Sequence, residues 1–167
     1  AMVQTFIPLL AEKHARIVFV GSISGRLATP YIGPYSASKF ALRALADAMR
    51  IELAPAGIGV SLIEPGSVKT PIWGKGRAEA VQIGERLGTN VRPHYRVALD
   101  RIVSITEGED RDGMPVEIVS STILHALVAP RPRAQYLLGK RAKIGSLIAN
   151  LPAGLRDRAI RASMRVK

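Results

Sequence analysis

Two short apolar runs with a helical segment between them constrain the fold of this 167-residue chain more than any other feature. The runs lie at 16–20 (RIVFV) and 58–63 (IGVSLI), and their β-branched and apolar residues are typical of buried strands. Residues 35–54 between them have helical apolar spacing, which Pro55 and Gly57 end. The apolar stripe of this predicted helix consists of Phe40, Leu42, Leu45, Ala48, Met49 and Leu53. A strand, a helix and a strand joined by short links predict a βαβ unit with parallel strands and a right-handed crossover.

The segments on both sides extend this alternation of helices and strands. We expect helices over 2–13, despite the Pro8 inside it, and over 116–128, followed by a short strand over 135–138. Residues 71–112 are richer in charge and glycine, and their weak periodicity predicts a mobile excursion with one or two short helices. This order of elements indicates an α/β fold that corresponds to one half of a doubly wound parallel sheet.

Composition excludes several kinds of site. The chain has no cysteine, so it cannot use disulfides, thiolate catalysis or cysteine metal ligands. Its three histidines, His14, His94 and His125, are scattered, and we interpret them as ordinary histidines rather than metal ligands. No apolar run approaches the roughly 18–20 residues of a membrane span. We therefore expect no metal site and a cytoplasmic location.

The basic charge is concentrated towards the carboxyl terminus. The net charge is +11, and residues 131–167 carry ten basic side chains against Asp157 alone. Such a segment can bind nucleic acid, an anionic membrane or an acidic partner, or it can form a solvated surface. We expect no nucleic-acid partner, because the chain has no reader motif, no interleaved aromatic residues and no basic patch outside this segment.

Residues 140–167 form a basic amphipathic tail. Its apolar residues recur every three or four positions among lysines and arginines. They are Ile144, Leu147, Ile148, Leu151 and Leu155. A basic amphipathic helix can lie in a membrane interface, whereas the same stripe can also pack on its own domain or on another subunit. We favour packing, and peripheral membrane contact stays the open alternative.

Tyr35 and Lys39 form the densest chemical signal in the sequence (YSASK). They stand four residues apart at the start of the predicted helix, so their side chains lie on one face, one turn from each other. A free phenol releases its proton only at about pH 10, and an ammonium one turn away favours the phenolate. The pair could therefore act as a general acid/base near neutral pH. A packed tyrosine beside a solvated lysine is the structural alternative.

Two further motifs follow the predicted strands, at the carboxyl edge where open α/β sheets bind ligands. Ser22 comes directly after the first strand, thirteen residues before Tyr35, and can hydrogen-bond a substrate oxygen. The segment 65–70 (PGSVKT) comes after the second strand. A serine after a strand, a tyrosine and a lysine on the next helix, and PGxVxT after the next strand together resemble the short-chain dehydrogenase/reductase family. Order and spacing agree over residues 16–71.

The resemblance implies a Rossmann-like fold and a role for each matching residue. Tyr35 would be the catalytic acid/base, and Lys39 would favour its phenolate and bind the nicotinamide ribose. Ser22, rather than the neighbouring Ser24, would hold the substrate oxygen. The implied cofactor is NAD or NADP, whose nicotinamide accepts or donates the hydride. The implied cofactor-binding residues are Tyr35, Lys39, Pro65, Gly66, Val68 and Thr70, with Thr70 on the carboxamide.

The region 71–112 occupies the position of the family's substrate loop. Trp73, the only tryptophan, could cover a bound substrate, and Tyr31 could form a wall of the pocket. A packing role is the alternative for both residues. The implied reaction interconverts an alcohol and a ketone or aldehyde. The apolar residues of the loop and the tail point to a lipophilic substrate.

The chain also departs from the family pattern. A glycine-rich turn that cradles the pyrophosphate is absent, and the only close glycine pairs, Gly57/Gly59 and Gly74/Gly76, do not lie between a strand and a helix. We expect that turn, the residues that select NAD or NADP, and the family's catalytic asparagine to precede Ala1. All 167 residues would then be the carboxyl-terminal part of a single domain.

Two consequences follow for assembly and for the alternative function. A sheet that begins at the strand 16–20 exposes an apolar edge, so we expect a homo-oligomer.

The alternative function is a non-catalytic, membrane-associated or scaffold protein that retains the half-fold. The presence of Ser22, Tyr35 and Lys39 together argues against that alternative, because a scaffold needs none of them.

Overall fold

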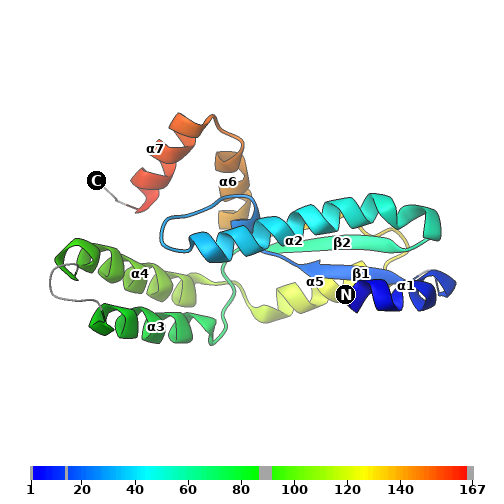
Figure 1. The fold of residues 1–167 in the computed structure, drawn as a ribbon, viewed down its shortest axis with the longest axis horizontal. Helices are drawn as coiled ribbons and strands as arrows, with labels where there is room; N and C mark the ends of the chain where they lie inside the picture. Colours follow the sequence, from blue (N-terminus) through cyan, green and yellow to red (C-terminus); the bar gives the residue numbers. More distant parts are fainter. Residues whose placement is uncertain (1, 14, 87–91, 165–167) are drawn as a thin grey trace. The chain divides into compact units, whose positions relative to one another are not determined.

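The computed structural model describes residues 2–13, 15–86 and 92–164, which divide into two compact units (Figure 1). The first unit comprises residues within 1–66 and 117–149 and contains the sheet. The second comprises residues within 67–116 and 150–167 and is mainly helical. The expectation that both units belong to a single domain stays a prediction.

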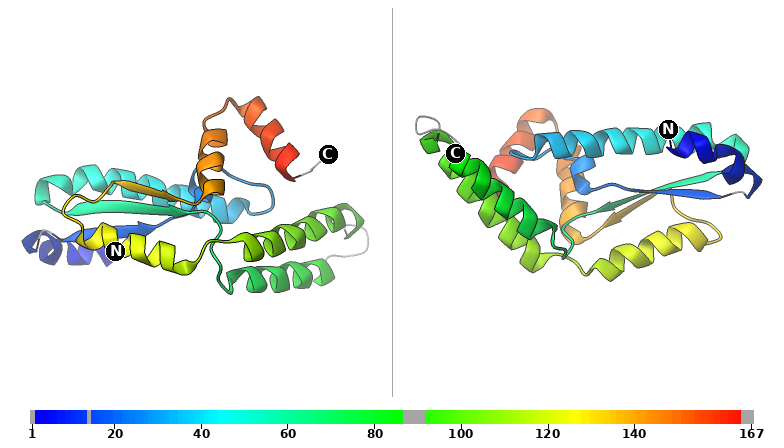
Figure 2. Two further views of the ribbon diagram at one scale, coloured as in Figure 1. Left: turned by 180° about the vertical axis from the view of Figure 1, so that it is seen from behind. Right: turned by 60° about the horizontal axis from the view of Figure 1, so that its bottom comes forward.

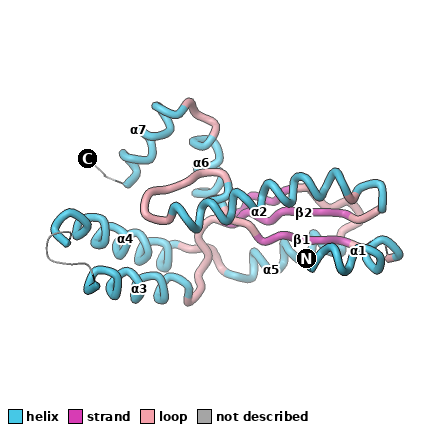
Figure 3. Tube along the Cα trace, viewed as in Figure 1, coloured by secondary structure: helices cyan, strands magenta, loops and turns pink. Residues whose placement is uncertain are grey.

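Three parallel strands form the sheet of the first unit (Figure 3). They are β1 (Arg16–Val20), β2 (Gly59–Pro65) and β3 (Gln135–Leu138), in that spatial order. Val18 of β1 pairs with Ser61 of β2, so the predicted parallel pair is confirmed, as are the predicted bounds of β1 and β3. The middle strand ends at Pro65, two residues beyond its expected end. The Pro-Gly turn therefore starts directly at the carboxyl edge of the sheet.

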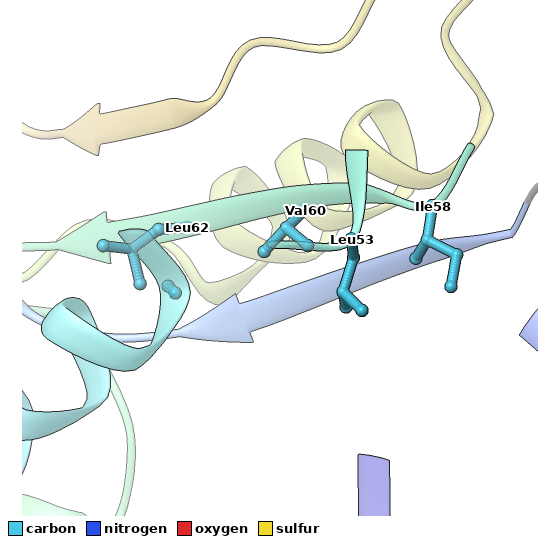
Figure 4. Packing of buried hydrophobic residues seen from close by; sticks show 5 residues of the cluster. Leu53, Ile58, Val60 and Leu62 are labelled. Atoms are coloured by element: carbon cyan, nitrogen blue, oxygen red, sulfur yellow. The ribbon is translucent and has the colours of Figure 1, made fainter. Parts of the chain in front are cut away.

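Helices cover both faces of this sheet (Figure 2). On one face lie α1 (Met2–Glu12) and α2 (Gly33–Glu52), and on the other lies α5 (Val116–Val128). Between the sheet and the first two helices is a buried core centred on β2 (Figure 4). Its residues are Ala46, Leu53, Ile58, Val60 and Leu62. Each buried leucine, isoleucine or valine contributes roughly 1.5–3 kcal/mol by leaving water, so the central strand anchors the unit.

The buried face of α2 differs from the predicted apolar stripe. Phe40, Leu45 and Ala48 belong to that stripe but are exposed, whereas Ser36 and Ala46 are buried. The stripe is therefore wrong for these three exposed residues, although its last member, Leu53, does reach the core. The physical reason is close packing near the carboxyl edge, where α2 meets its neighbours through small and polar side chains and turns large apolar ones outward.

The second unit contains two long helices, α3 (Ile72–Arg86) and α4 (Arg92–Asp112), which pack side by side. The expectation of one or two short helices in 71–112 is wrong, because these helices have 15 and 21 residues. Glycine lowers helix propensity and weakens the apolar period, but tertiary packing overrides propensity. Ala80 and Gly84 are buried on α3, and their small size permits a close approach of the neighbouring helix.

A short parallel bridge closes the base of this helical pair. Val68 bridges with Met114. The backbone N–H of Lys69 donates to the carbonyl of Met114, and the N–H of Met114 donates to the carbonyl of Ser67, each with an N···O distance of 2.9 Å. The chain therefore leaves for α3 and returns from α4 at one point.

The basic tail forms two helices, α6 (Lys140–Ala149) and α7 (Ala153–Met164). Most of its predicted apolar stripe is exposed. The exposed members are Ile144, Leu147, Leu151 and Leu155. Within the described ranges, no helix has the length and apolar character needed to cross a membrane. The stripe thus remains available for contact with another surface.

Candidate active site

Ser22 lies where β1 leaves the sheet. The backbone N–H of Gly21 donates to the carbonyl of Ile63 at 2.7 Å, which holds the end of β1 against β2. Ser22 then caps a short 3-10 helix, η1 (Ile23–Gly25), and its Oγ accepts a hydrogen bond from the N–H of Ser24 at 3.1 Å. A serine hydroxyl has one hydrogen to donate besides its lone pairs. The contact with Ser24 uses only a lone pair, so the hydroxyl hydrogen stays available to a ligand. Ser24 contributes its backbone N–H to this cap, and the choice of Ser22 over Ser24 stays a prediction.

Tyr35 and Lys39 lie on the first turns of α2. The helix starts at Gly33 with Pro34 at its first turn, a position where the missing N–H of proline costs nothing. Lys39 Nζ lies 5.6 Å from the centroid of the Tyr35 ring. The same ammonium donates to the carbonyl of Val20 at 3.2 Å, at the last residue of β1. The structure thus brings Tyr35 and Lys39 together and ties both to the strand end that carries Ser22.

Gly25 allows this close approach. A Cβ at Gly25 would lie only 2.7 Å from the backbone oxygen of Lys39, closer than real Cβ contacts occur. The loop that carries Ser22 therefore touches the backbone of α2 at the turn that carries Lys39. That the hydroxyls of Ser22 and Tyr35 and the ammonium of Lys39 face one cleft stays a prediction, and so do their catalytic roles.

Tyr31 has an unusual backbone. Its φ is 72°, the left-handed region, and its side chain is exposed. A bulky residue in this region is an outlier that costs of order 1–3 kcal/mol. Such strain is concentrated at ligand sites, which supports the candidate role of Tyr31 at the rim of the site. Contact with substrate stays a prediction.

The remaining predicted residues divide between the two units. Pro65 is buried at the end of β2, and the N–H of Gly66 donates to the carbonyl of Leu138 at 3.0 Å. Val68, Thr70 and Trp73 belong to the second unit. There, Trp73 Nε1 donates to the carbonyl of Val68 at 2.8 Å, so the indole is anchored on the segment that precedes α3. This contact gives Trp73 a packing role, and its contact with substrate stays a prediction.

A buried carboxylate beside the site was missed at the sequence level. Glu64 is only 1% exposed and sits directly before Pro65. Two guanidinium groups, from Arg26 and Arg43, bind it. The signal that could have found it is an acidic residue at the end of an otherwise apolar strand (IGVSLIE), because buried carboxylates need cationic partners.

One of the three histidines has a described side chain. His125 Nδ1 lies 3.1 Å from the hydroxyl of Tyr136, so this histidine has an ordinary polar partner. His14 and the side chain of His94 lie outside the described part of the chain. Among the side chains that the structure describes, no group of three or more metal-ligating residues occurs.

A parallel sheet covered by helices, with a serine, a tyrosine and a lysine at its carboxyl edge, defines the class of this protein. It is a Rossmann-like α/β protein with a candidate acid–base site. Residues 1–80 match the family model described as short chain dehydrogenase. The chain therefore belongs to the short-chain dehydrogenase family, as the motifs at residues 16–71 predict.

Individual relatives agree with this assignment. The chain is 34% identical to the NADPH-dependent 3-dehydrocapnine reductase of Ornithobacterium rhinotracheale, over 78% of this chain and 44% of the relative. It is 35% identical to retinol dehydrogenase 5 of Mus musculus, over 90% of this chain and 49% of that relative. A solved short-chain dehydrogenase/reductase from Burkholderia phymatum, in complex with NAD, superposes with a TM-score of 0.59 at 26% identity, over 99% of this chain and 54% of that one. The chain thus spans about half the length of the relatives that it matches.

Proposed function

We propose that the protein is an NAD- or NADP-dependent oxidoreductase that interconverts an alcohol and a ketone or aldehyde, with a lipophilic substrate. When bound, the nicotinamide supplies the hydride acceptor or donor. In alcohol oxidation, Tyr35 as the phenolate takes the hydroxyl proton while the carbinol carbon loses its hydride, which leaves a carbonyl. Ser22 donates its free hydroxyl hydrogen to the substrate oxygen. Reduction of the carbonyl reverses each transfer.

The observation that carries this proposal is the placement of Lys39. Its ammonium has three hydrogens, and one of them is held by the carbonyl of Val20. The others remain for the hydroxyls of a ribose, and the charge lies beside the Tyr35 ring. This donor set suits a nicotinamide ribose, and Pro65 and Gly66 are further candidate cofactor residues of the same unit. Val68 and Thr70 are candidate cofactor residues of the second unit. The relatives named for NADPH and NAD support the same cofactor class.

The proposal is tested by supplying the purified protein with NAD or NADP and a panel of alcohols. The panel contains retinol, a sterol and a short secondary alcohol. We expect one coenzyme reduced for each carbonyl formed, measured by absorbance and by chromatography of the product. Lipophilic alcohols should give the higher kcat/KM, as the relative named retinol dehydrogenase suggests. A folded protein that reduces neither coenzyme with any alcohol would favour the non-catalytic scaffold instead.

We further propose a second copy of the chain and an anionic lipid surface as partners, with the protein located in the cytoplasm. The outward faces of α1 and α2 expose Phe6, Leu9, Phe40, Leu45 and Ile51, an apolar area suited to another subunit. In the basic tail, helix α7 combines the exposed Leu155 with cationic neighbours, a pattern that suits anionic lipid. Sedimentation with and without phosphatidylserine vesicles should give an oligomer that pellets with the vesicles at low salt. A monomer in both conditions contradicts the two partner proposals.

A further inference from the structure

Glu64 is a buried carboxylate bound by two guanidinium groups. Its carboxylate accepts from Arg26 Nε at 2.9 Å and from Arg43 Nη1 at 2.8 Å, both on Oε1. Arg26 Nη2 binds the second oxygen, Oε2, so the contact with Arg26 is bidentate. Both oxygens are therefore occupied by charged donors, the strongest kind of hydrogen bond that a protein forms.

The three residues of this cluster belong to the three segments that carry the candidate site. Arg26 directly follows Gly25, in the loop that begins with Ser22. Arg43 lies one helical turn after Lys39 on α2. Glu64 itself stands at the end of β2, directly before the Pro-Gly turn. One carboxylate thus fixes the loop, the helix and the strand end against one another.

Further polar contacts extend this cluster through Arg26. Arg26 donates to Gln135 Oε1 at 2.7 Å and to Ser146 Oγ at 3.3 Å. Gln135 Nε2 in turn donates to Asp47 Oδ1 at 3.1 Å, and Arg50 Nη1 donates to the same oxygen at 2.7 Å. Partial burial raises the pKa of Asp47, but the hydrogen bonds from Arg50 and Gln135 outweigh it and lower that pKa below the ordinary 3.8. Asp47 therefore stays charged near neutral pH, and the network keeps a fixed geometry.

A network of this kind exceeds what stability alone requires. The attraction within a buried ion pair often only offsets the free energy lost when both charges leave water. Apolar side chains of similar volume often stabilise a fold as well or better. What the charged cluster adds is geometry, because a bidentate guanidinium–carboxylate pair fixes distance and angle. Misplacement of a reacting group by about 1 Å can cost about 100-fold in rate.

We propose that Glu64 is a positioning residue, which acts through Arg26 and Arg43 to hold the loop that carries Ser22 against the helix that carries Tyr35 and Lys39. This inference rests on the proposed dehydrogenase function. Tyr35 and Lys39 keep their mutual spacing because both lie on α2. Loss of the carboxylate, or of Arg43, lets the Ser22 loop move relative to that helix. The hydroxyls of Ser22 and Tyr35 then meet the substrate oxygen in a less productive geometry, and kcat falls.

The test compares Glu64→Gln and Arg43→Gln with the control Arg16→Gln. Arg16 is also a partly buried guanidinium that holds a structural contact, since its Nη1 donates to the carbonyl of Leu127 at 2.8 Å, but it lies at the opposite end of β1 from the site. We expect kcat to fall about 10- to 100-fold in both network variants, with little change in the KM of the alcohol. Arg43→Lys, which keeps a cation beside Glu64, should recover part of the lost kcat.

A second readout does not depend on activity. Backbone amide hydrogen exchange of the loop residues 22–26 should be faster in the network variants than in Arg16→Gln, because the loop is held less firmly. If Glu64→Gln does not fold, the Arg43 variants decide alone. A wild-type protein without dehydrogenase activity, whose network variants still show the faster exchange, would overturn the proposed function and keep the positioning role. Network variants that match Arg16→Gln in kcat and in loop exchange would overturn the positioning role.

Discussion

Replacement of Tyr35 by phenylalanine is expected to lower kcat for alcohol oxidation by about 10²–10⁴-fold, the usual contribution of a general acid/base. The substitution removes one oxygen and leaves the ring in place beside the Lys39 ammonium. The side chain of Tyr35 is exposed, and its contact with Lys39 is made through the ring, which phenylalanine keeps. The melting temperature should therefore stay close to that of the parent while turnover is lost.

Tyr136→Phe is the matched control for this experiment. Its hydroxyl accepts from the N–H of Arg133 at 2.8 Å and contacts His125, so its loss affects the fold rather than the candidate site. We expect Tyr136→Phe to lower the melting temperature and to keep near-parental kcat. Parental turnover in Tyr35→Phe would instead remove Tyr35 from the mechanism.

Gly25→Ala is expected to destabilise the protein by roughly 1–3 kcal/mol, the usual cost of overpacking. The added methyl group would meet the backbone oxygen of Lys39 at 2.7 Å. A backbone atom cannot swing aside as a flexible side chain can, so the loop and the helix must separate. Because that loop carries Ser22, kcat should fall together with stability. Urea unfolding and steady-state kinetics of the same preparation measure both effects.

Gly33→Ala is the control for this prediction. A Cβ at Gly33 meets nothing within 4 Å, and alanine is the better helix former at the start of α2. We expect this variant to be as stable as the parent or slightly more stable. Equal effects of Gly25→Ala and Gly33→Ala on the free energy of unfolding would show that the close approach at Gly25 does not limit stability.

The strands and the βαβ order were predictable because strong local signals coincide there. The run 16–20 is apolar and ends at a glycine, and the structure reproduces its bounds as β1. The Tyr35–Lys39 pair was predictable for a similar reason, since helical spacing alone puts two side chains four residues apart on one face. The observed contact between the ammonium and the Tyr35 ring agrees with that spacing.

Features that depend on tertiary contacts were not predictable in this way. Phe40 and Leu45 are as apolar as Leu53, and only the position of the sheet decides which of them is buried. The helix lengths in 71–112 depend on the packing of α3 against α4, which residue spacing does not reveal. The partners of Glu64 lie 38 and 21 residues away along the chain, so no local pattern identifies them.

The bridge between Val68 and Met114 makes the helical pair between them an exchangeable cassette. Two backbone hydrogen bonds from Lys69 and Met114 fasten its entry and its exit together, so its interior can vary without a change at the attachment point. Doubling the length of a closed loop costs only about 0.6 kcal/mol of closure entropy. Natural variation can therefore lengthen this helical pair, shorten it or change its surface residues at a small cost in folding free energy. The candidate acid–base residues Tyr35 and Lys39 and the candidate substrate residue Trp73 thus lie in segments that can evolve separately.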